Sequence, residues 1–408
     1  MKPRRKVFLQ YAALTVVACV AAVVLAEVYL ASTGGPKWNL PFYNRLYPYV
    51  MFRPTENLTY ISSETFEMSH HTEPVHYYSN ADALRVSAAD YALPKEKPPA
   101  QLRFAVLGGS AVEVATNFEA TLPGSLKTVL LKEHPGYDIE VINGGIQSSI
   151  SRQAVLHFLF TVSDYHPDVV VLYDGQNDLG LPLMYDGRSN YPYNFQTMQE
   201  AWDVYRSEHQ ASLFQVMLDR SYLYAALRAR MGSDETATTT NTVAKAMGRG
   251  PYAKAAEDIL NDPDYVKEYV SSYLANWRQI IKLSTYYEYQ PVFVLQATGG
   301  VDRDYSIAAL KAGYFGEDEP AAHWVDAFIA LYDEAGRQME EMRAEHPDVI
   351  FLNLSDFLQP SKEHFWDGVH VYDEVNLKLA ARIYEEIQGM VESRLSSVPK
   401  QTEAATIP

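Results

Sequence analysis

Five short apolar segments, separated by longer segments with helical spacing, constrain the fold of this chain more than any other feature. The apolar segments are residues 102–107, 139–142, 169–173, 291–296 and 349–352. Apolar residues recur at helical spacing in residues 122–133, 149–164, 265–283 and 323–345, and residues 374–395 form a closing helix. Strands that alternate with helices favour a parallel sheet covered on both faces. The sequence therefore predicts an α/β fold with a parallel sheet.

The amino terminus has the pattern of a membrane segment. Four basic residues stand at its start: Lys2, Arg4, Arg5 and Lys6. They precede the uncharged residues 7–26, a stretch long enough to cross a bilayer as a helix. This charge bias favours a cytoplasmic amino terminus, with the remainder of the chain on the periplasmic side of the cell membrane. We expect an uncleaved single-pass signal anchor. A signal peptide cleaved after Ala26 and a lipoprotein modified at Cys19 are the alternatives.

Charge and cysteine content exclude several classes of protein. The chain has 34 Lys and Arg against 51 Asp and Glu, a formal net charge of −17, which argues against nucleic-acid binding. A single cysteine allows neither an internal disulfide framework nor a Cys-based zinc site. The cluster His70, His71, Glu73 and His76 has metal-ligand residue types, but its spacing matches no standard site. We interpret it as a solvated surface cluster, and we predict no metal and no cofactor.

The composition along the chain predicts three parts. Residues 1–31 are a cytoplasmic basic stub and the membrane anchor, and residues 32–100, rich in Pro and Tyr, are a juxtamembrane stalk and cover. Residues 101–398 are the main domain, which contains an insertion at residues 180–263. The insertion holds a polar tract, residues 233–242, and several tyrosines: Tyr185, Tyr191, Tyr193, Tyr205, Tyr222 and Tyr224. These tyrosines line a substrate groove or simply cover the sheet.

Four polar segments follow predicted strands or precede the last helix. They are Gly108-Gly109-Ser110, Asn143-Gly144-Gly145 with Ser148 after it, Gly175-Gln176-Asn177-Asp178, and Asp367-Gly368-Val369-His370. Ligands of open parallel sheets gather beyond the carboxyl ends of the strands, so these segments are candidate site residues. A Gly-Gly-Ser turn alone is weak evidence, and no phosphate-binding lysine follows it. The spacing of Asp367 and His370 allows the carboxylate to fix the imidazole tautomer that leaves Nε2 as a base.

The order of these segments resembles the four motif blocks of the SGNH (GDSL-like) hydrolases. His370 follows Ser110 by 260 residues, and the resemblance covers residues 103–387. It implies a three-layer α/β/α, flavodoxin-like domain that cleaves acyl esters without a metal. It further implies that Ser110 is the nucleophile, His370 the general base and Asp367 the residue that orients His370. The side chain of Asn177 and the backbone N–H groups of Ser148 and Ser110 would form the oxyanion hole.

Two positions depart from the pattern of this family. Gly109 stands where the family name implies Asp, and Ser148 stands where the second block usually ends in Gly. A backbone donor at Ser148 survives this change if serine adopts the backbone conformation that glycine would take. Otherwise the loss of one donor costs about 2.7–4 kcal/mol of transition-state stabilisation. We expect Gly144 and Gly145 to serve close backbone packing.

The combination predicts a carboxylic ester hydrolase, tethered to the membrane. Its location favours acyl esters, including O-acetyl esters, of cell-surface or exported polysaccharide as substrates. A lipid esterase or lysophospholipase is the next candidate, followed by an acyltransferase of the same fold. A catalytically inactive binding protein of this fold is the alternative outside enzymes.

Overall fold

The computed structural model describes residues 22–26, 28–29, 44–47, 49–65, 74–192, 253–311 and 318–400. The chain divides into two compact units, residues 1–42 with 196–243 and residues 43–195 with 244–408. In the first unit the structure describes two short helical pieces, residues 22–26 and 28–29. The second unit contains the sheet and every predicted site residue.

The predicted membrane segment, residues 7–26, is described only over residues 22–26. In the part of the chain that the structure describes, no helix combines the length and the apolar character that a bilayer crossing requires. The membrane anchor therefore stays a prediction.

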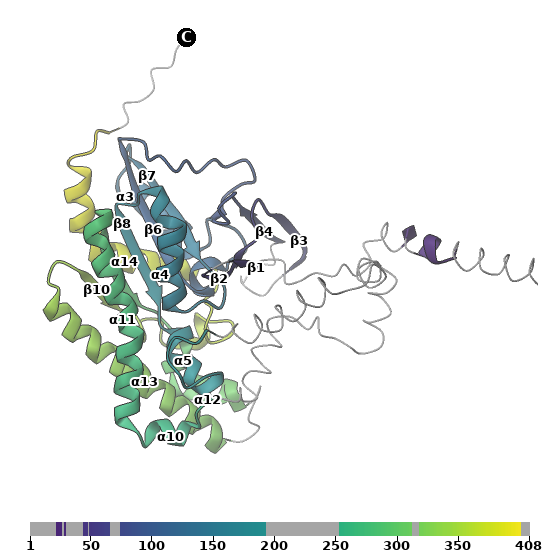
Figure 1. Ribbon diagram of the computed structural model, residues 1–408, viewed down its shortest axis with the longest axis vertical. Coiled ribbons are helices and arrows are strands. Elements are labelled where there is room, and N and C mark those ends of the chain that lie inside the picture. Colours follow the sequence, from purple (N-terminus) through teal and green to yellow (C-terminus); the bar gives the residue numbers. More distant parts are fainter. Residues whose placement is uncertain are drawn as a thin grey trace, which may run out of the picture. The chain divides into compact units, whose positions relative to one another are not determined.

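The main sheet has eight strands in the order β10-β9-β8-β6-β7-β5-β4-β3 (Figure 1). Five of them pair in parallel: β10 (Ile350–Asn353), β9 (Gln290–Leu295), β8 (Val169–Asp174), β6 (Gln101–Gly108) and β7 (Asp138–Gly145). These are the five strands that the sequence predicts. Counted from β6, their order is 2-1-3-4-5, the flavodoxin-like order. The order reverses between β6 and β8, so their carboxyl ends flank the switch point, where such folds bind ligands.

The other three strands correct the prediction of a wholly parallel sheet. β3 (Thr59–Thr65), β4 (Pro74–Ser79) and β5 (Arg85–Val86) pair antiparallel and join the free edge of β7. They come from residues 32–100, which we had predicted as a stalk and cover. In β4 the side chains alternate between the two sides of the sheet, with every second residue buried. The sheet is therefore mixed, and part of the predicted stalk belongs to it.

Helices cover both faces of the sheet and make three layers (Figure 1). α3 (Leu122–Glu133) and α14 (Val375–Leu395) pack on one face, around a core that includes Phe104 and Val171. α4 (Ser151–Phe160), α11 (Pro263–Tyr287) and α13 (Asp318–Glu345) pack on the other. The remaining helices are α2 (Ser110–Glu113), α5 (Gln176–Met184), α10 (Ala256–Leu260), α12 (Arg303–Leu310), η1 (Val162–Tyr165), η2 (Gly299–Val301) and η4 (Ser361–Glu363).

Capping residues mark the first residues of two long helices, α3 and α11. Thr121 accepts a hydrogen bond from the N–H of Gly124 at 3.2 Å and caps α3. Asp262 accepts from the N–H of Tyr265 at 2.9 Å and caps α11, and Pro263 takes the first helical position. α11 ends at Glu288, whose left-handed φ of 59° stops the helix. Both helices therefore begin at residues suited to a helix start, whereas the left-handed end of α11 is formed by a glutamate rather than a glycine.

The predicted insertion, residues 180–263, is described only at its two ends. Its first residues complete α5, and its last residues include α10. Tyr185 is buried and Tyr191 is half-buried. The polar tract and four of the predicted tyrosines, Tyr193, Tyr205, Tyr222 and Tyr224, lie outside the described residues. Their role as groove or cover stays open.

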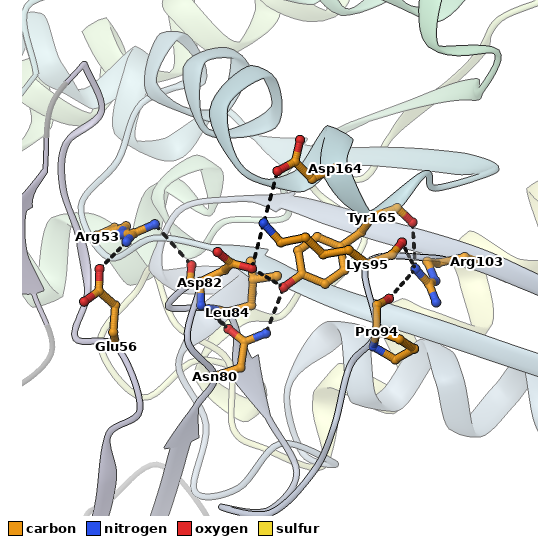
Figure 2. A network of polar contacts seen from close by, with 10 residues as sticks. All are labelled: Arg53, Glu56, Asn80, Asp82, Leu84, Pro94, Lys95, Arg103, Asp164 and Tyr165. Carbon is orange, nitrogen blue, oxygen red and sulfur yellow. Dashed lines mark hydrogen bonds and ion pairs between the residues drawn. The ribbon is translucent and has the colours of Figure 1, made fainter. Parts of the chain in front are cut away.

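A polar network attaches the residues before β6 to the sheet (Figure 2). Asn80 accepts hydrogen bonds from the N–H groups of Asp82 and Leu84, at 3.0 and 2.9 Å. The Tyr165 hydroxyl donates to Asp82 at 2.6 Å and accepts from Asn80 at 3.1 Å. Lys95 bridges Asp82 and Asp164 at 3.2 and 3.1 Å. These contacts fix the segment that connects the antiparallel strands to β6.

Arg103, on β6, forms the buried end of this network (Figure 2). Its side chain is completely buried and donates to the carbonyl oxygens of Pro94 and Tyr165, at 2.9 and 2.7 Å. It also donates to the side-chain oxygen of Gln101 at 2.9 and 2.6 Å. A buried guanidinium is stable only when its donors are satisfied, and here backbone carbonyls accept from Nη1 while the Gln101 side chain accepts from Nε and Nη2.

Replacing Arg103 tests this attachment. Arg103→Met retains much of the side-chain volume but leaves the carbonyl oxygen of Tyr165 without its buried donor and Gln101 without its partner, so the free energy of unfolding should fall by about 2–5 kcal/mol. Urea unfolding followed by circular dichroism measures the change. Arg337→Ala is the control, because Arg337 pairs with Glu334 and Glu341 on the solvent side of α13 and its loss should have little effect. Equal stability of Arg103→Met and the wild type would contradict the role of Arg103.

Candidate active site

Ser110, His370 and Asp367 form a continuous hydrogen-bonded line. The distance between His370 Nε2 and Ser110 Oγ is 2.7 Å, and that between His370 Nδ1 and Asp367 Oδ2 is 2.6 Å. The carboxylate of Asp367 can only accept from Nδ1–H, which leaves Nε2 to accept the hydroxyl proton of Ser110. The predicted nucleophile, base and orienting acid are thus within hydrogen-bonding distance, although 260 residues separate the serine from the histidine.

Two glycines place Ser110 at the carboxyl end of β6. A Cβ atom on Gly108 would lie 2.2 Å from the carbonyl oxygen of Tyr173, on the neighbouring strand β8. A Cβ atom on Gly109 would lie 2.6 Å from Asn177 Nδ2. Glycine at 109 therefore gives room to the predicted oxyanion donor, which is a physical reason for the departure from the Asp of the family name.

The turn between η4 and α14 presents His370. Asp367 Oδ1 accepts from the backbone N–H groups of Val369 and His370, at 2.9 and 2.7 Å, so both carboxylate oxygens have donors. Burial raises the pKa of Asp367, but the charge of His370 and these hydrogen bonds outweigh burial and hold the pKa below its usual value. The ring of Trp366 stacks on that of His370, with centroids 5.1 Å apart. Asp367 therefore stays ionised and fixes the imidazole.

The predicted oxyanion hole has one side-chain donor and two backbone donors. Asn177 Nδ2 donates to the carbonyl oxygen of Ser149 at 2.7 Å, and an amide NH₂ group has a second hydrogen to donate. Ser148 has a φ of 56°, in the left-handed region where the family usually has glycine. Within the described residues, the N–H groups of Ser148 and Ser110 have no hydrogen-bond acceptor. Serine at 148 thus adopts the left-handed conformation and leaves its N–H available.

The antiparallel strands contribute to the site through Arg85. Its guanidinium donates to the carbonyl oxygens of Glu113 and Ala115, in the short segment after Ser110, the second of them at 3.0 Å. It also donates to the carbonyl oxygen of His76 on β4, at 3.3 Å. The segment that carries Ser110 is therefore fastened to strands that sequence reasoning assigned to a stalk. A two-residue strand such as β5 has too short a pattern to be predicted.

A further hydrogen-bonded pair links the serine and histidine segments. Asp373, three residues after His370, accepts from the N–H of Thr116 at 3.1 Å and from its hydroxyl. The turn before His370 is held from another side, because the carbonyl oxygen of Gly368 accepts from the N–H of Gly299 at 2.9 Å. Sequence reasoning missed these supports, since nothing in a local pattern pairs residues so far apart.

Two buried carboxyl groups lie beside Asn177. Asp174 accepts from the Tyr273 hydroxyl and the Trp277 indole N–H, at 2.7 and 2.9 Å. Asp178 accepts from the backbone N–H and the hydroxyl of Ser151, at 2.9 and 2.6 Å. Burial raises the pKa of Asp178 to about 7. Burial and the charge of Asp178 raise the pKa of Asp174 well above its usual value. The sequence showed Asp178 beside Asn177, but not this burial.

The histidine cluster that we interpret as a solvated surface cluster is described only at His76. His70, His71 and Glu73 lie outside the described residues, and His76 is part of β4. Among the residues that the structure describes, no three His, Cys, Asp or Glu side chains are grouped so that they could hold a metal ion.

No family model matches the chain, and no curated protein matches it. The acetylxylan esterase Axe2 from Geobacillus stearothermophilus is similar in structure, with 12% identity and a TM-score of 0.35 over 70% of this chain and 94% of that one. The acetyl xylan esterase AlAXEase has 16% identity and a TM-score of 0.32, over 70% of this chain and 98% of its own.

A third similar structure is LAE5, an alpha/beta hydrolase enzyme from the metagenome of Lake Arreo, Spain. It has 12% identity and a TM-score of 0.35, over 70% of this chain and 95% of that one. These proteins are esterases and hydrolases by name, the class of enzyme that the motifs of this sequence resemble.

Substituting Gly109 tests the close approach of Asn177. In Gly109→Ala the new Cβ would lie 2.6 Å from Asn177 Nδ2, so the amide must move. We expect the rate at which a fluorophosphonate probe labels Ser110 to fall about 10- to 100-fold, as for a displaced site group. Gly389→Ala on α14 is the control, because its Cβ would meet nothing within 4 Å. Unchanged labelling of Gly109→Ala would show that Asn177 tolerates the added carbon.

The buried carboxyl group of Asp178 should make stability depend on pH. Its pKa is about 7 in the folded chain and about 3.9 when unfolded, so between these values the folded state binds more protons and stability falls as pH rises. Asp178→Asn removes this titration. The melting temperature of the variant relative to the wild type should therefore increase from pH 5 to pH 8. Burial lowers the pKa of His157 to about 3, so its titration makes stability rise with pH. This contribution is the same in the variant and the wild type and does not affect their difference. A pH-independent difference would contradict the raised pKa.

Proposed function

We propose that this chain is a serine esterase that hydrolyses acyl esters. The observation that carries the proposal is the line from Ser110 Oγ through His370 to Asp367, with contacts of 2.7 and 2.6 Å. A serine hydroxyl becomes a useful nucleophile when a positioned base takes its proton. The line begins at the switch point of the sheet, beside three donors suited to an oxyanion.

The residues suggest how the reaction proceeds. Ser110 Oγ attacks the ester carbonyl carbon while His370 Nε2 takes its proton, and the negative charge of Asp367 stabilises the resulting imidazolium. The oxyanion accepts hydrogen bonds from Asn177 Nδ2 and from the N–H groups of Ser148 and Ser110. His370 then protonates the leaving alcohol, and the acyl group remains on Ser110. Water, deprotonated by His370, attacks this acyl-enzyme, and His370 returns the proton to Ser110 Oγ as the bond to the acyl group breaks and the acid leaves.

For the substrate, we propose O-acyl groups, including acetyl groups, of a cell-surface or exported polysaccharide. The support comes from the amino-terminal pattern, in which four basic residues precede the uncharged residues 7–26. An anchor of this kind would hold the enzyme at the periplasmic side of the cell membrane. The net charge of −17 also opposes close approach to anionic lipid headgroups, which favours polysaccharide over phospholipid.

Labelling of Ser110 tests the proposed function. A fluorophosphonate probe should label the detergent-solubilised wild type, and Ser110→Ala should lose the label, because the probe reacts with the hydroxyl that His370 activates. Ser110→Ala and His370→Ala should both fold normally and lose at least about 10³-fold in turnover of p-nitrophenyl acetate. Ser125→Ala, a buried serine on α3, is the matched control and should behave as the wild type.

The same preparation separates the substrate classes. Release of acetate from an O-acetylated polysaccharide is expected to exceed release of fatty acid from a lysophospholipid. The labelled band should be found in the membrane fraction at about the full mass of 46.0 kDa. A well-folded wild type that neither labels nor hydrolyses acetate esters would refute the esterase proposal. A shorter band would refute the uncleaved anchor.

A further inference from the structure

The segment that carries the Ser148 N–H is held by two neighbouring side chains of α5. Asn177 Nδ2 donates to the carbonyl oxygen of Ser149 at 2.7 Å. The next residue, Asp178, accepts from the N–H and the hydroxyl of Ser151, at 2.9 and 2.6 Å. The first turn of α5 therefore contacts the chain one residue and three residues after Ser148.

This contact supplies what the local sequence lacks. α4 begins at Ser151, and the preceding residue, Ile150, has no side-chain oxygen with which to cap the helix. The carboxyl group of Asp178, on α5, takes that role by accepting the N–H of Ser151 at 2.9 Å. Asp178, Ser149 and Ser151 are all at least 95% buried, so water does not replace these hydrogen bonds.

Other contacts fix the opposite end of the same segment. The carbonyl oxygen of Gly108, two residues before the nucleophile, accepts from the N–H of Ile146 at 3.0 Å and from the hydroxyl of Ser149 at 3.1 Å. Ser148 lies between these anchored residues, in a left-handed conformation that is unfavourable for serine. Such a conformation persists only where the surrounding contacts hold it.

We propose that Asp178 is a positioning residue for the oxyanion hole. Its hydrogen bonds to Ser151 fix residues 148–151. Asn177 and Asp178 both belong to the first turn of α5, so this turn holds the Ser148 N–H in a constant position relative to the Asn177 amide. This inference rests on the proposed function. Donors placed before the reaction stabilise the transition state most, and a displacement of about 1 Å costs on the order of 10²-fold in rate.

The experiment compares Asp178→Ala with Asp178→Asn. Asp178→Ala removes both acceptors and should lower kcat for p-nitrophenyl acetate about 10- to 100-fold with little change in KM, the pattern of an interaction that acts in the transition state. Asp178→Asn keeps an acceptor for the Ser151 N–H and should restore most of kcat. The control is Asp186→Asn, a buried carboxyl group that pairs with Arg188 at 2.6 Å, and it should leave kcat unchanged.

Two readouts separate positioning from a general loss of structure. Hydrogen exchange of peptides that cover residues 146–155 should accelerate in Asp178→Ala while peptides from β9 and α14 stay protected. In an Asn177→Ala background, itself expected to lose about 10²–10³-fold in kcat, Asp178→Ala should cost less than in the wild type. Residues that act through one oxyanion hole are not additive.

The outcomes distinguish this inference from the proposed function. An active wild type beside a folded Asp178→Ala with wild-type kcat, or with a change in KM alone, overturns the inference only. A wild type that neither labels nor turns over overturns the proposed function and the inference with it. If Asp178→Ala does not fold, Ser151→Ala decides, since it removes the hydroxyl contact and keeps the backbone one. Its kcat should fall several-fold, and an unchanged kcat overturns the inference.

Discussion

The close approach of backbone at the carboxyl ends of β6, β7 and β8 is the constraint on which the rest of this structure depends. A side chain on Gly108 would collide with the backbone of β8, and one on Gly145 would lie 2.8 Å from Glu113 in α2. A Cβ on Gly144 would lie 2.7 Å from the side chain of Leu107. Glycine at these positions lets the loops after the three strands approach closely, and hydrogen bonds join them. Ser110, Asn177 and the turn before α4 therefore lie side by side.

The histidine segment is attached to this centre by different means. It has no place in the sheet, and its position depends on side chains and on one backbone contact. Asp373 holds it to Thr116, and the carbonyl of Gly368 holds it to Gly299, after β9. The contact between His370 and Ser110 is therefore supported from two directions, which is what a base with a fixed orientation requires.

Much of this architecture could be predicted from the sequence, for physical reasons. Strands buried on both faces are continuous apolar runs, so all five parallel strands were identified. The site residues stand out because glycine and polar residues follow such runs. The antiparallel strands β3, β4 and β5 are not predicted from the sequence. β5 has only two residues, and β4 alternates polar and apolar positions within a Pro- and Tyr-rich region. The Gly144 and Gly145 packing was predicted, whereas the contact between Asp178 and Ser151 was not, since it joins residues 27 positions apart without a local signal.

The long separation between the serine and its base has a consequence for synthesis of the protein. Ser110 is made early, but His370 follows it 260 residues later, in the last part of the chain. Local contacts form first during folding and distant ones later, so the sheet around the serine is able to assemble before its base arrives. A nascent or truncated chain thus carries an ordinary alcohol at position 110. Under the proposed mechanism, Ser110 becomes reactive only when the turn that carries His370 docks, so the synthesis of that late segment switches on its chemistry.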